Sequence, residues 1–362
     1  MSISKIGTLM IGNSNMITPI VACNIYITAA ASHASTLLSL LRRAQDHCRD
    51  LRHASQQHNK RDDKHASVAI VHAYADIPYD RSSFHLAGNA DCVADVASRL
   101  ICNALDEIDL DIGNNSHPTI GVIDHISVMK MRKCTDNIAA TTAKQIGNNI
   151  SKTNIVNLYY YGSACPNNTS LATVRRRTSF FNSGGAIDKE DNHNTEQEDT
   201  TTKRVAKGSC TIGTPANFVE NYNIRLTSNI SFEQAKTLTQ FVRGRNIETK
   251  GYGVLGVEAL TLPYGREKSK VYEVACNLTS PKVGSAEKVQ AQLMKWIDKQ
   301  RQELCEINTS ADISKYNYDY FVEKAYRVGT TENQCIDVLS KDDISLDDLD
   351  KDAYNKFQDL LL

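Results

Sequence analysis

The chain has 362 residues, a length that favours two α/β-sized units over a single core. Its 41 Lys and Arg against 42 Asp and Glu give a formal net charge of −1, so no overall positive field attracts a polyanion and we expect no nucleic-acid partner. No stretch approaches the roughly 18 consecutive apolar residues of a membrane helix. The ten cysteines form no C-x-x-C pair, and scattered single thiols are typical of a reducing compartment. We therefore expect a cytoplasmic protein that binds neither a membrane nor a metal.

The first part of the chain alternates short apolar strands with helices whose apolar residues recur at helical spacing. Asn89 stands where it can cap the second of these helices. The strands are expected at 20–28, 67–72, 83–87, 119–129 and 155–161, and the helices at 34–51, 93–104 and 136–150. This order is β-α-β-β-α-β with one further α-β, which is the ferredoxin-like arrangement with helices on one face of the sheet.

A second cycle of the same kind follows a polar stretch. The run at 188–204 is nearly free of apolar residues and predicts a surface insertion or linker. Strands are then expected at 217–226, 254–262 and 271–278, and helices at 232–242 and 286–304. The expected fold class is α/β (α+β), with two tandem ferredoxin-like βαββαβ-type subdomains. The expected divisions are 17–164, an insertion at 165–209 that completes the first subdomain, 210–306, and an acidic tail at 307–362 with a short surface helix.

His117 is the most informative single residue for chemistry. It lies in the loop Asn114-Asn115-Ser116-His117-Pro118, directly before an expected strand. A loop at the end of a strand keeps a side chain reachable while the strand fixes its backbone, and Pro118 favours an extended conformation at His117. An imidazole with a near-neutral pKa suits general-base work. The same pattern also fits an exposed loop histidine without a catalytic role.

Two further motifs leave alternatives open. Arg175-Arg176-Arg177 could clamp carboxylates through bidentate hydrogen bonds, or it could be a solvated face. The run from Lys250 to Val257 resembles an RNA-recognition strand, but Tyr252 is its only aromatic residue, and base stacking needs several. We interpret it as the glycine-containing entry to a strand.

The segment NSHPTIGVIDHI (115–126) resembles the G-E-H-P-R-x-G-x-x-D segment of glutamate formimidoyltransferases (formiminotransferases). Its resemblance to the G-S-H-P-R-L-G-V-V-D-H-I segment of their plant and algal relatives is closer still. Other matches follow in the same order along the chain: ACNIYIT (22–28), Arg81 with Gly88, LYYYGSA (158–164), NYNI (221–224) and VYEVACNLTSP (271–281). Each match is short, and their common order over residues 20–305 makes them specific together.

The resemblance implies two α/β subdomains with folate bound in a groove between them, usually in a homodimer. Family members move a formimino group from N-formimino-L-glutamate to N5 of tetrahydrofolate, which is a substrate, and no metal is implied. The histidine of H-P-R corresponds to His117, which would act as general base on the N5 proton. The residues that would hold folate or substrate are Arg81, Ser116, Thr119, Lys207, Gly208, Gly213, Asn221 and Asn223.

The chain departs from the family pattern at several positions. Thr119 stands where the family has an arginine, Tyr74 replaces an acidic residue, and little more than Lys207-Gly208 and Ile212-Gly213 remains of the folate loop. Loss of a charge-assisted hydrogen bond to a carboxylate typically costs about 1.5–3 kcal/mol. Two functions therefore stay open: a folate-dependent formimino- or formyltransferase, and a non-catalytic folate- or ligand-binding relative that retains the fold.

Overall fold

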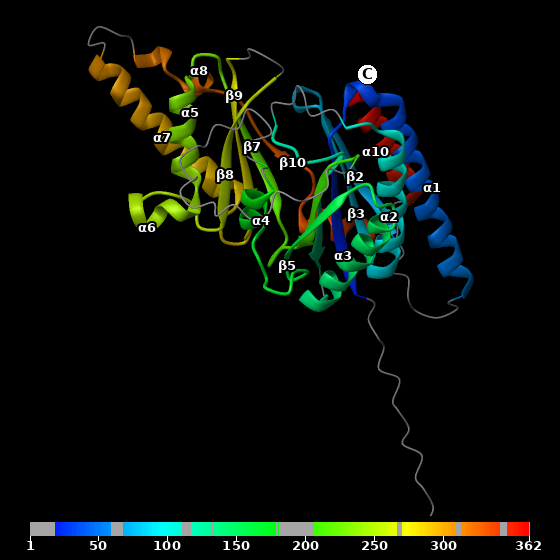
Figure 1. The fold of residues 1–362 in the computed structure, drawn as a ribbon. Coiled ribbons are helices and arrows are strands. Elements are labelled where there is room, and N and C mark those ends of the chain that lie inside the picture. Colours follow the sequence, from blue (N-terminus) through cyan, green and yellow to red (C-terminus); the bar gives the residue numbers. More distant parts are fainter. Residues whose placement is uncertain are drawn as a thin grey trace, which may run out of the picture.

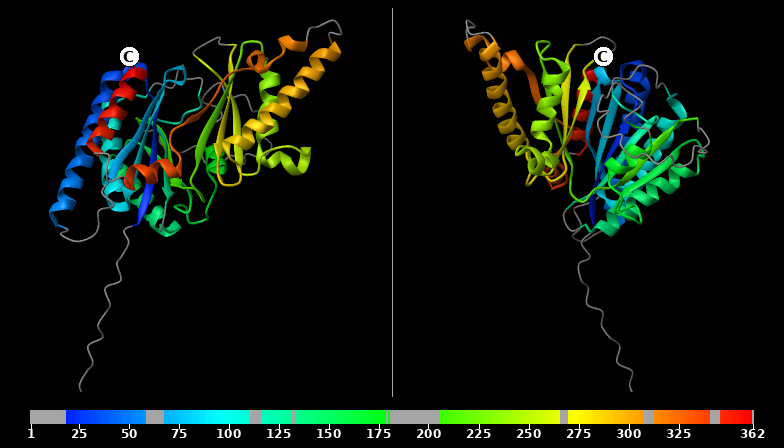
Figure 2. Two further views of the ribbon diagram at one scale, coloured as in Figure 1. Left: turned by 180° about the vertical axis from the view of Figure 1, so that it is seen from behind. Right: turned by 60° about the vertical axis from the view of Figure 1, so that its left-hand side comes forward.

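A computed structural model describes residues 19–58, 68–110, 117–131, 134–178, 180, 206–265, 270–307, 313–340 and 346–361. The two β-sheets lie face to face at the centre, and helices cover the outer face of each, as Figures 1 and 2 show from three sides. Within the described ranges, no helix combines the length and the apolar character needed to span a membrane.

The first sheet has six strands in the order β2-β3-β1-β4-β6-β5. The strands are β1 (Ile20–Ile27), β2 (Val68–Asp76), β3 (Arg81–Asn89), β4 (Ile123–Lys130), β5 (Asn157–Gly162) and β6 (Ser209–Thr214). The helices are α1 (Ala34–His58), α2 (Ala90–Glu107), α3 (Asp136–Ser151) and the short α4 (Leu171–Arg177). The order 2-3-1-4 of the first four strands is ferredoxin-like and antiparallel, and β6 and β5 extend the sheet in parallel beyond β4.

The second sheet repeats the ferredoxin-like order as β10-β7-β9-β8, and its strands pair antiparallel. The strands are β7 (Glu220–Leu226), β8 (Val257–Pro263), β9 (Tyr272–Leu278) and β10 (Val322–Val328). Its covering helices are α5 (Phe232–Val242) and α7 (Ala286–Ile307), joined by the shorter α6 (Ile247–Lys250) and α8 (Tyr318–Phe321). Two further helices follow β10 along the chain, α9 (Glu332–Ser340) and α10 (Leu346–Leu361). The prediction of two ferredoxin-like units is confirmed.

Strict alternation along the strands explains the layers. In β1 every second side chain is fully buried against the helices: Val21, Cys23, Ile25 and Ile27. Tyr26, between two of them, points the other way and reaches the second unit. Since successive strand residues face opposite sides, each sheet gives an apolar face to its helices and a largely polar face to the other sheet. The Asn89 side chain caps α2 as predicted, accepting from the Asp91 amide at 2.9 Å.

Two of the expected divisions are corrected by the topology. Residues 209–214 form β6, which pairs with β4 and β5, so the first sheet continues past the expected boundary at 210. The chain after 307 is not a simple tail, because β10 is the fourth strand of the second sheet. These pairings join segments far apart in sequence, which local periodicity does not reveal. The polar run at 188–204 lies outside the described residues.

The C-terminal helix α10 returns to the first unit and packs beside α1 and β2 (Figure 1). Phe357 is fully buried there, with its ring centroid 5.3 Å from that of Phe84 in β3. Arg52 and Asp350 form an ion pair of 2.8 Å, with 8% and 2% of their side chains exposed. The expected short surface helix is therefore a structural part of the first core.

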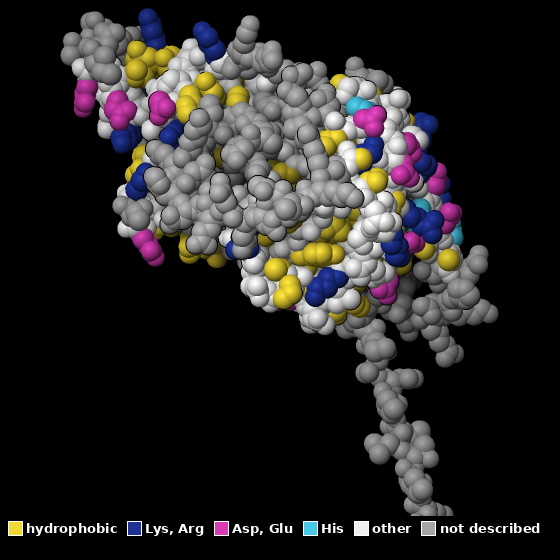
Figure 3. All heavy atoms as spheres, viewed as in Figure 1, with side chains coloured by type: hydrophobic (Ala, Val, Ile, Leu, Met, Phe, Trp, Pro, Cys, Tyr) yellow, Lys and Arg dark blue, Asp and Glu magenta, His cyan; other side chains and the backbone are white. Residues whose placement is uncertain are grey.

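Charges of both signs lie side by side along the helical edge on the right of Figure 3. On α1, Arg49 pairs with Asp46 at 2.9 Å, and Arg43 reaches Glu107 of α2 at 2.6 Å. This mixture agrees with the net charge of −1.

Candidate functional site

The turn before β3 places Arg81 at the face between the sheets. Residues 77–79 form a single helical turn, and Asp80 follows in the left-handed conformation with φ 47°. The Asp80 carboxylate accepts from the Ala30 amide at 3.0 Å, which fixes the turn to the chain just after β1. Arg81 is then the first residue of β3.

Arg81 joins His117 to a buried carboxylate. Its Nη1 lies 2.7 Å from His117 Nε2, and its Nη2 donates to Asp124 Oδ2 at 2.7 Å. A guanidinium only donates hydrogen bonds, so His117 accepts through Nε2. Arg81 Nη1 also lies 3.0 Å from Nδ1, but Nδ1 is closer, at 2.7 Å, to the Pro118 carbonyl, which can only accept, so Nδ1 carries the proton and donates to Pro118. The contacts therefore assign a neutral imidazole protonated on Nδ1.

His117 is partly buried between aromatic rings instead of standing free in a loop. Its ring centroid lies 5.6 Å from that of Tyr79 and 6.3 Å from that of Phe180. Burial, together with the neighbouring Arg81 guanidinium, holds the pKa of His117 well below its usual range. The expectation of an exposed imidazole with a near-neutral pKa is therefore wrong, because the His117 side chain packs against charged and aromatic groups.

Cationic groups outnumber anionic ones around His117. The Arg81 guanidinium carbon lies 4.7 Å from the centroid of the Tyr26 ring, and that of Arg175 lies 4.2 Å from the Phe180 centroid. Asp124 forms an ion pair with Arg81 and also interacts electrostatically with Arg175. Within the described part of the chain, the buried Nε atoms of both arginines have no acceptor. Two guanidinium groups against one carboxylate suit an anionic ligand.

The structure places the other expected site residues in different surroundings. Thr119 is only 3% exposed, and its Oγ1 lies 2.6 Å from Thr28 Oγ1, so it contributes to packing beneath the loop. Lys207 donates to Asp109 at 2.9 Å, and Gly208 forms a bridge with Gly121. Ser116 lies outside the described residues.

The remaining three lie on the face between the sheets. A Cβ at Gly213 would come within 2.2 Å of the Tyr161 carbonyl oxygen, so glycine lets the two strands approach. Asn221 Oδ1 accepts from Tyr26 at 3.3 Å, which links the two units. Asn223 is 8% exposed and donates to Glu273 at 2.7 Å. Arg81 and His117 are thus in contact, and the two asparagines bind other side chains.

Sequence reasoning assigned no role to Asp124 or Tyr79. Asp124 lies inside the VIDHI run, and a single acidic residue in an otherwise apolar strand was the signal that could have identified it. Its side chain is 1% exposed, and a buried carboxylate needs a partner. Tyr79 stands two residues before Arg81, and only the folded turn brings its ring against His117.

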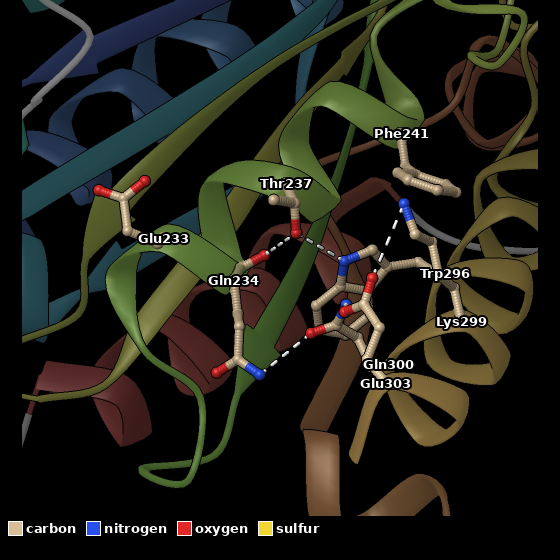
Figure 4. Close-up of a pocket in the computed structure, with 8 residues that line it drawn as sticks. All are labelled: Glu233, Gln234, Thr237, Phe241, Trp296, Lys299, Gln300 and Glu303. Atoms are coloured by element: carbon tan, nitrogen blue, oxygen red, sulfur yellow. Dashed lines mark hydrogen bonds and ion pairs between the residues drawn. The ribbon is translucent and has the colours of Figure 1, made fainter. Parts of the chain in front are cut away.

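A separate pocket of about 160 Å³ lies between α5 and α7, on the helical side of the second sheet (Figure 4). Its polar groups largely bind one another, as in the Trp296 Nε1 to Thr237 Oγ1 bond of 2.9 Å and the Gln234 to Gln300 bond of 3.0 Å. It is lined by Glu233, Gln234, Thr237, Phe241, Trp296, Lys299, Gln300 and Glu303. Among the described residues, no three or more His, Cys, Asp or Glu side chains gather where they could hold a metal.

Comparison with known proteins gives a family match over the first unit. The family described as "Formiminotransferase domain, N-terminal subdomain" matches residues 29–215, from just after β1 to the end of β6. The chain is also 26% identical over 235 residues to a "Formiminotransferase cyclodeaminase-like protein" of Arabidopsis thaliana. That alignment covers 62% of this chain and 76% of the relative.

Two solved structures show little similarity to the whole chain. The periplasmic protease PqqL of Escherichia coli gives a TM-score of 0.19 at 10% identity, over 94% of this chain and 41% of that one. A putative M16-like peptidase of Alicyclobacillus acidocaldarius gives 0.18 at 12% identity, over 94% of this chain and 90% of that one.

Proposed function

Because the chain belongs to the formiminotransferase family, we propose that it is a folate-dependent transferase that moves a formimino (or formyl) group between glutamate and N5 of tetrahydrofolate. His117 is the general base of this proposal. The observation that best supports the proposed function is the contact between Arg81 and His117. These residues lie 36 positions apart, each matches a motif of the family, and they meet at one point on the face between the sheets.

The proposed reaction needs one proton to leave N5 of tetrahydrofolate and one to reach the glutamate nitrogen. As N5 attacks the formimino carbon, His117 Nε2 accepts the N5 proton. The tetrahedral carbon then releases glutamate as its bond to the glutamate nitrogen breaks and the electron pair goes to that nitrogen. The neutral, Nδ1-protonated imidazole is the form that can accept through Nε2.

Arg81 occupies Nε2 in the structure, so substrate must draw this guanidinium away before the base can act. Glutamate and the folate tail both carry carboxylates, which bind guanidinium in bidentate fashion. A substrate carboxylate on Arg81 would free Nε2 and offset the positive charge that disfavours an imidazolium there. Arg175 supplies a second cation for the same anions.

The alternative is a non-catalytic folate- or ligand-binding relative, and one observation favours it. Thr119 stands where the family has an arginine, and its side chain is buried against Thr28. The family's charged residue is therefore replaced here by a packing residue. In this alternative, Arg81 and Arg175 hold an anionic ligand while His117 stays locked by its hydrogen bonds.

Calorimetric titration with tetrahydrofolate and 5-formyltetrahydrofolate, followed by a turnover assay with N-formimino-L-glutamate, separates these functions. Binding with turnover supports the transferase. Binding without turnover of formimino or formyl donors supports the binding relative. Absence of heat with either folate contradicts the transferase and favours a binding relative whose ligand lies outside the folates.

A further inference from the structure

A second cluster of ionisable side chains lies where the two units meet, next to the His117 site. Its centre is Glu273 of β9, whose side chain is fully buried. Glu273 Oε1 accepts from Tyr79 at 3.1 Å and Asn223 at 2.7 Å, and Oε2 accepts from Tyr326 at 2.7 Å. Hydrogen bonds to a carboxylate favour its charged form, so these donors lower the pKa of Glu273, although burial raises it above the ordinary value.

Asp76 is the other acid of this cluster, and its surroundings differ. It ends β2, an edge strand, and is paired directly with Arg81 in the sheet register. Directly opposed residues of antiparallel strands share one face, so Asp76 lies on the face that carries Arg81. Its carboxyl is partly exposed, and among the described residues none donates a hydrogen bond to it.

The charges around Asp76 favour its protonated form. Burial, together with the charge of Glu273, raises the pKa of Asp76 to about 7, although Arg225 and Arg81 act in the opposite sense. Asp76 therefore retains a proton near neutrality, while the three donors to Glu273 favour the charged form of that carboxyl. The groups that face Asp76 are Glu273 of β9, Arg225 of β7, Arg81 of β3, Tyr326 of β10, Tyr74 of β2, and Tyr79 and Tyr264.

Tyr79 connects this cluster to the base. Its hydroxyl donates to Glu273 at 3.1 Å, while its ring centroid lies 5.6 Å from that of His117. Asp76 and Tyr79 belong to the same turn, three residues apart. Tyr79 thus stands between Asp76, which retains a proton, and His117, whose Nε2 carries none. Arg81 lies beside both Asp76 and His117.

We propose that Asp76 is the proton donor to the glutamate nitrogen that departs in the transfer reaction, an assignment that rests on the proposed function. His117 Nε2 takes the proton from N5. The Asp76 carboxyl gives its proton to the glutamate nitrogen as the carbon–nitrogen bond breaks and its electron pair passes to that nitrogen. The proton on His117 returns through solvent to the Asp76 carboxylate, so one proton moves from N5 to glutamate in each turnover.

The test compares Asp76→Asn with wild type, Asp76→Glu and Asp136→Asn, a control on the surface of α3 where Asp136 pairs with Lys130. Removal of a general acid typically lowers kcat by about 10²-fold or more. We expect that loss in Asp76→Asn, partial recovery in Asp76→Glu, and none in Asp136→Asn. Wild-type kcat is expected to fall as pH rises through about 7, and this alkaline limb is expected to vanish in Asp76→Asn.

Two further measurements separate a chemical role from a structural one. A formimino donor with a weakly basic arylamine leaving group needs less protonation, so it is expected to reduce the defect of Asp76→Asn but not that of His117→Ala. The infrared spectrum of wild type is expected to contain a protonated-carboxyl band that Asp76→Asn lacks. This band is expected to disappear as pH rises through about 7. Wild-type kcat and pH profile in Asp76→Asn would overturn the Asp76 assignment alone. Absence of wild-type turnover would overturn the proposed function and this assignment together.

Discussion

The hydroxyl of Tyr79 donates to Glu273 across the two units at 3.1 Å. Tyr79 belongs to the turn before β3, and Glu273 belongs to β9 of the second sheet. Since Glu273 is fully buried, each of its donors stabilises a charge that water cannot reach. The turn that carries Arg81 is therefore tied to the second unit by a hydrogen bond to a charged group.

Tyr79→Phe removes this hydroxyl and keeps the ring that contacts His117. A hydrogen bond to a charged group typically contributes about 1.5–3 kcal/mol, so we expect the free energy of unfolding to fall by that amount. Chemical denaturation measures it. Tyr272→Phe, on the same strand as Glu273, is the control, and an equal loss there would show that the Glu273 contact is not the cause.

Arg81→Met removes the guanidinium between Asp124 and His117. Asp124 is left as a buried charge without this partner, which typically costs about 3–5 kcal/mol of stability. The same change removes a positive neighbour of His117, so the pKa of His117 is expected to rise. Denaturation and an NMR titration of the His117 ring measure the two effects. The double variant Arg81→Met/Asp124→Asn is expected to recover part of the stability, and no recovery would contradict the pairing.

Stability is expected to fall steeply in acid because His85 and His125 are buried on the face between the sheets. They are 1% and 7% exposed, and burial holds the pKa of each well below 6.5. The unfolded chain takes up these protons as pH falls below about 6.5, while the folded chain does not. The stabilising contribution is thus complete above about pH 6.5. Below that pH, each histidine lowers the free energy of unfolding by up to about 1.4 kcal/mol per pH unit.

Denaturation curves between pH 7.5 and 5 measure this slope. His85→Gln is expected to reduce it, and a change at the exposed His53 is expected to leave it unaltered. An identical slope in His85→Gln would contradict the assignment.

Phe357→Ala tests whether the C-terminal helix belongs to the first core. The side chain is fully buried beside Phe84, and a change of this kind typically costs about 3–5 kcal/mol. Lys356→Ala removes the neighbouring surface pair with Asp352, for which a loss below about 1 kcal/mol is expected. Similar losses in the two variants would show that α10 is not docked as described.

Arg175→Ala is expected to weaken binding of folate polyglutamates and to reduce the dependence of that binding on salt. Charges on exposed ligand tails interact over about 8–10 Å at physiological ionic strength. Calorimetric titrations at two salt concentrations measure this effect. Arg176→Ala, in the exposed part of the same run, is the control. Affinity that responds neither to salt nor to Arg175→Ala would contradict a role in anion binding.

Local periodicity predicted much of the fold. The α5 helix spans 232–242 as expected, and the Asn89 cap follows from its side-chain chemistry. The position of β6 did not follow, because its parallel partners β4 and β5 are set by the tertiary fold. The role of α10 was also missed, since its charged residues suggested a surface helix while Phe357 and Asp350 are buried.

For the site, the sequence predicted roles for His117 and Arg81, which stay predictions, but it did not predict their contact. Asp124 and Tyr79 received no role because each is a single polar or aromatic residue whose meaning depends on what folds against it. The pKa of His117 was predicted near its ordinary value, since burial and a neighbouring guanidinium are properties of the folded chain.

Formimino transfer by His117→Ala, compared with wild type and His125→Ala, tests the central claim most directly. We expect wild type to form the N5-formimino product from N-formimino-L-glutamate and tetrahydrofolate, and to keep its activity below pH 6.5, since the pKa of His117 is lowered. His117→Ala is expected to lose about 10²–10⁴-fold in kcat, while tetrahydrofolate binding changes far less, because a base acts mainly in the transition state. His125→Ala is expected to lose stability instead. Turnover by His117→Ala at the wild-type rate, or absence of turnover in wild type, would contradict the account.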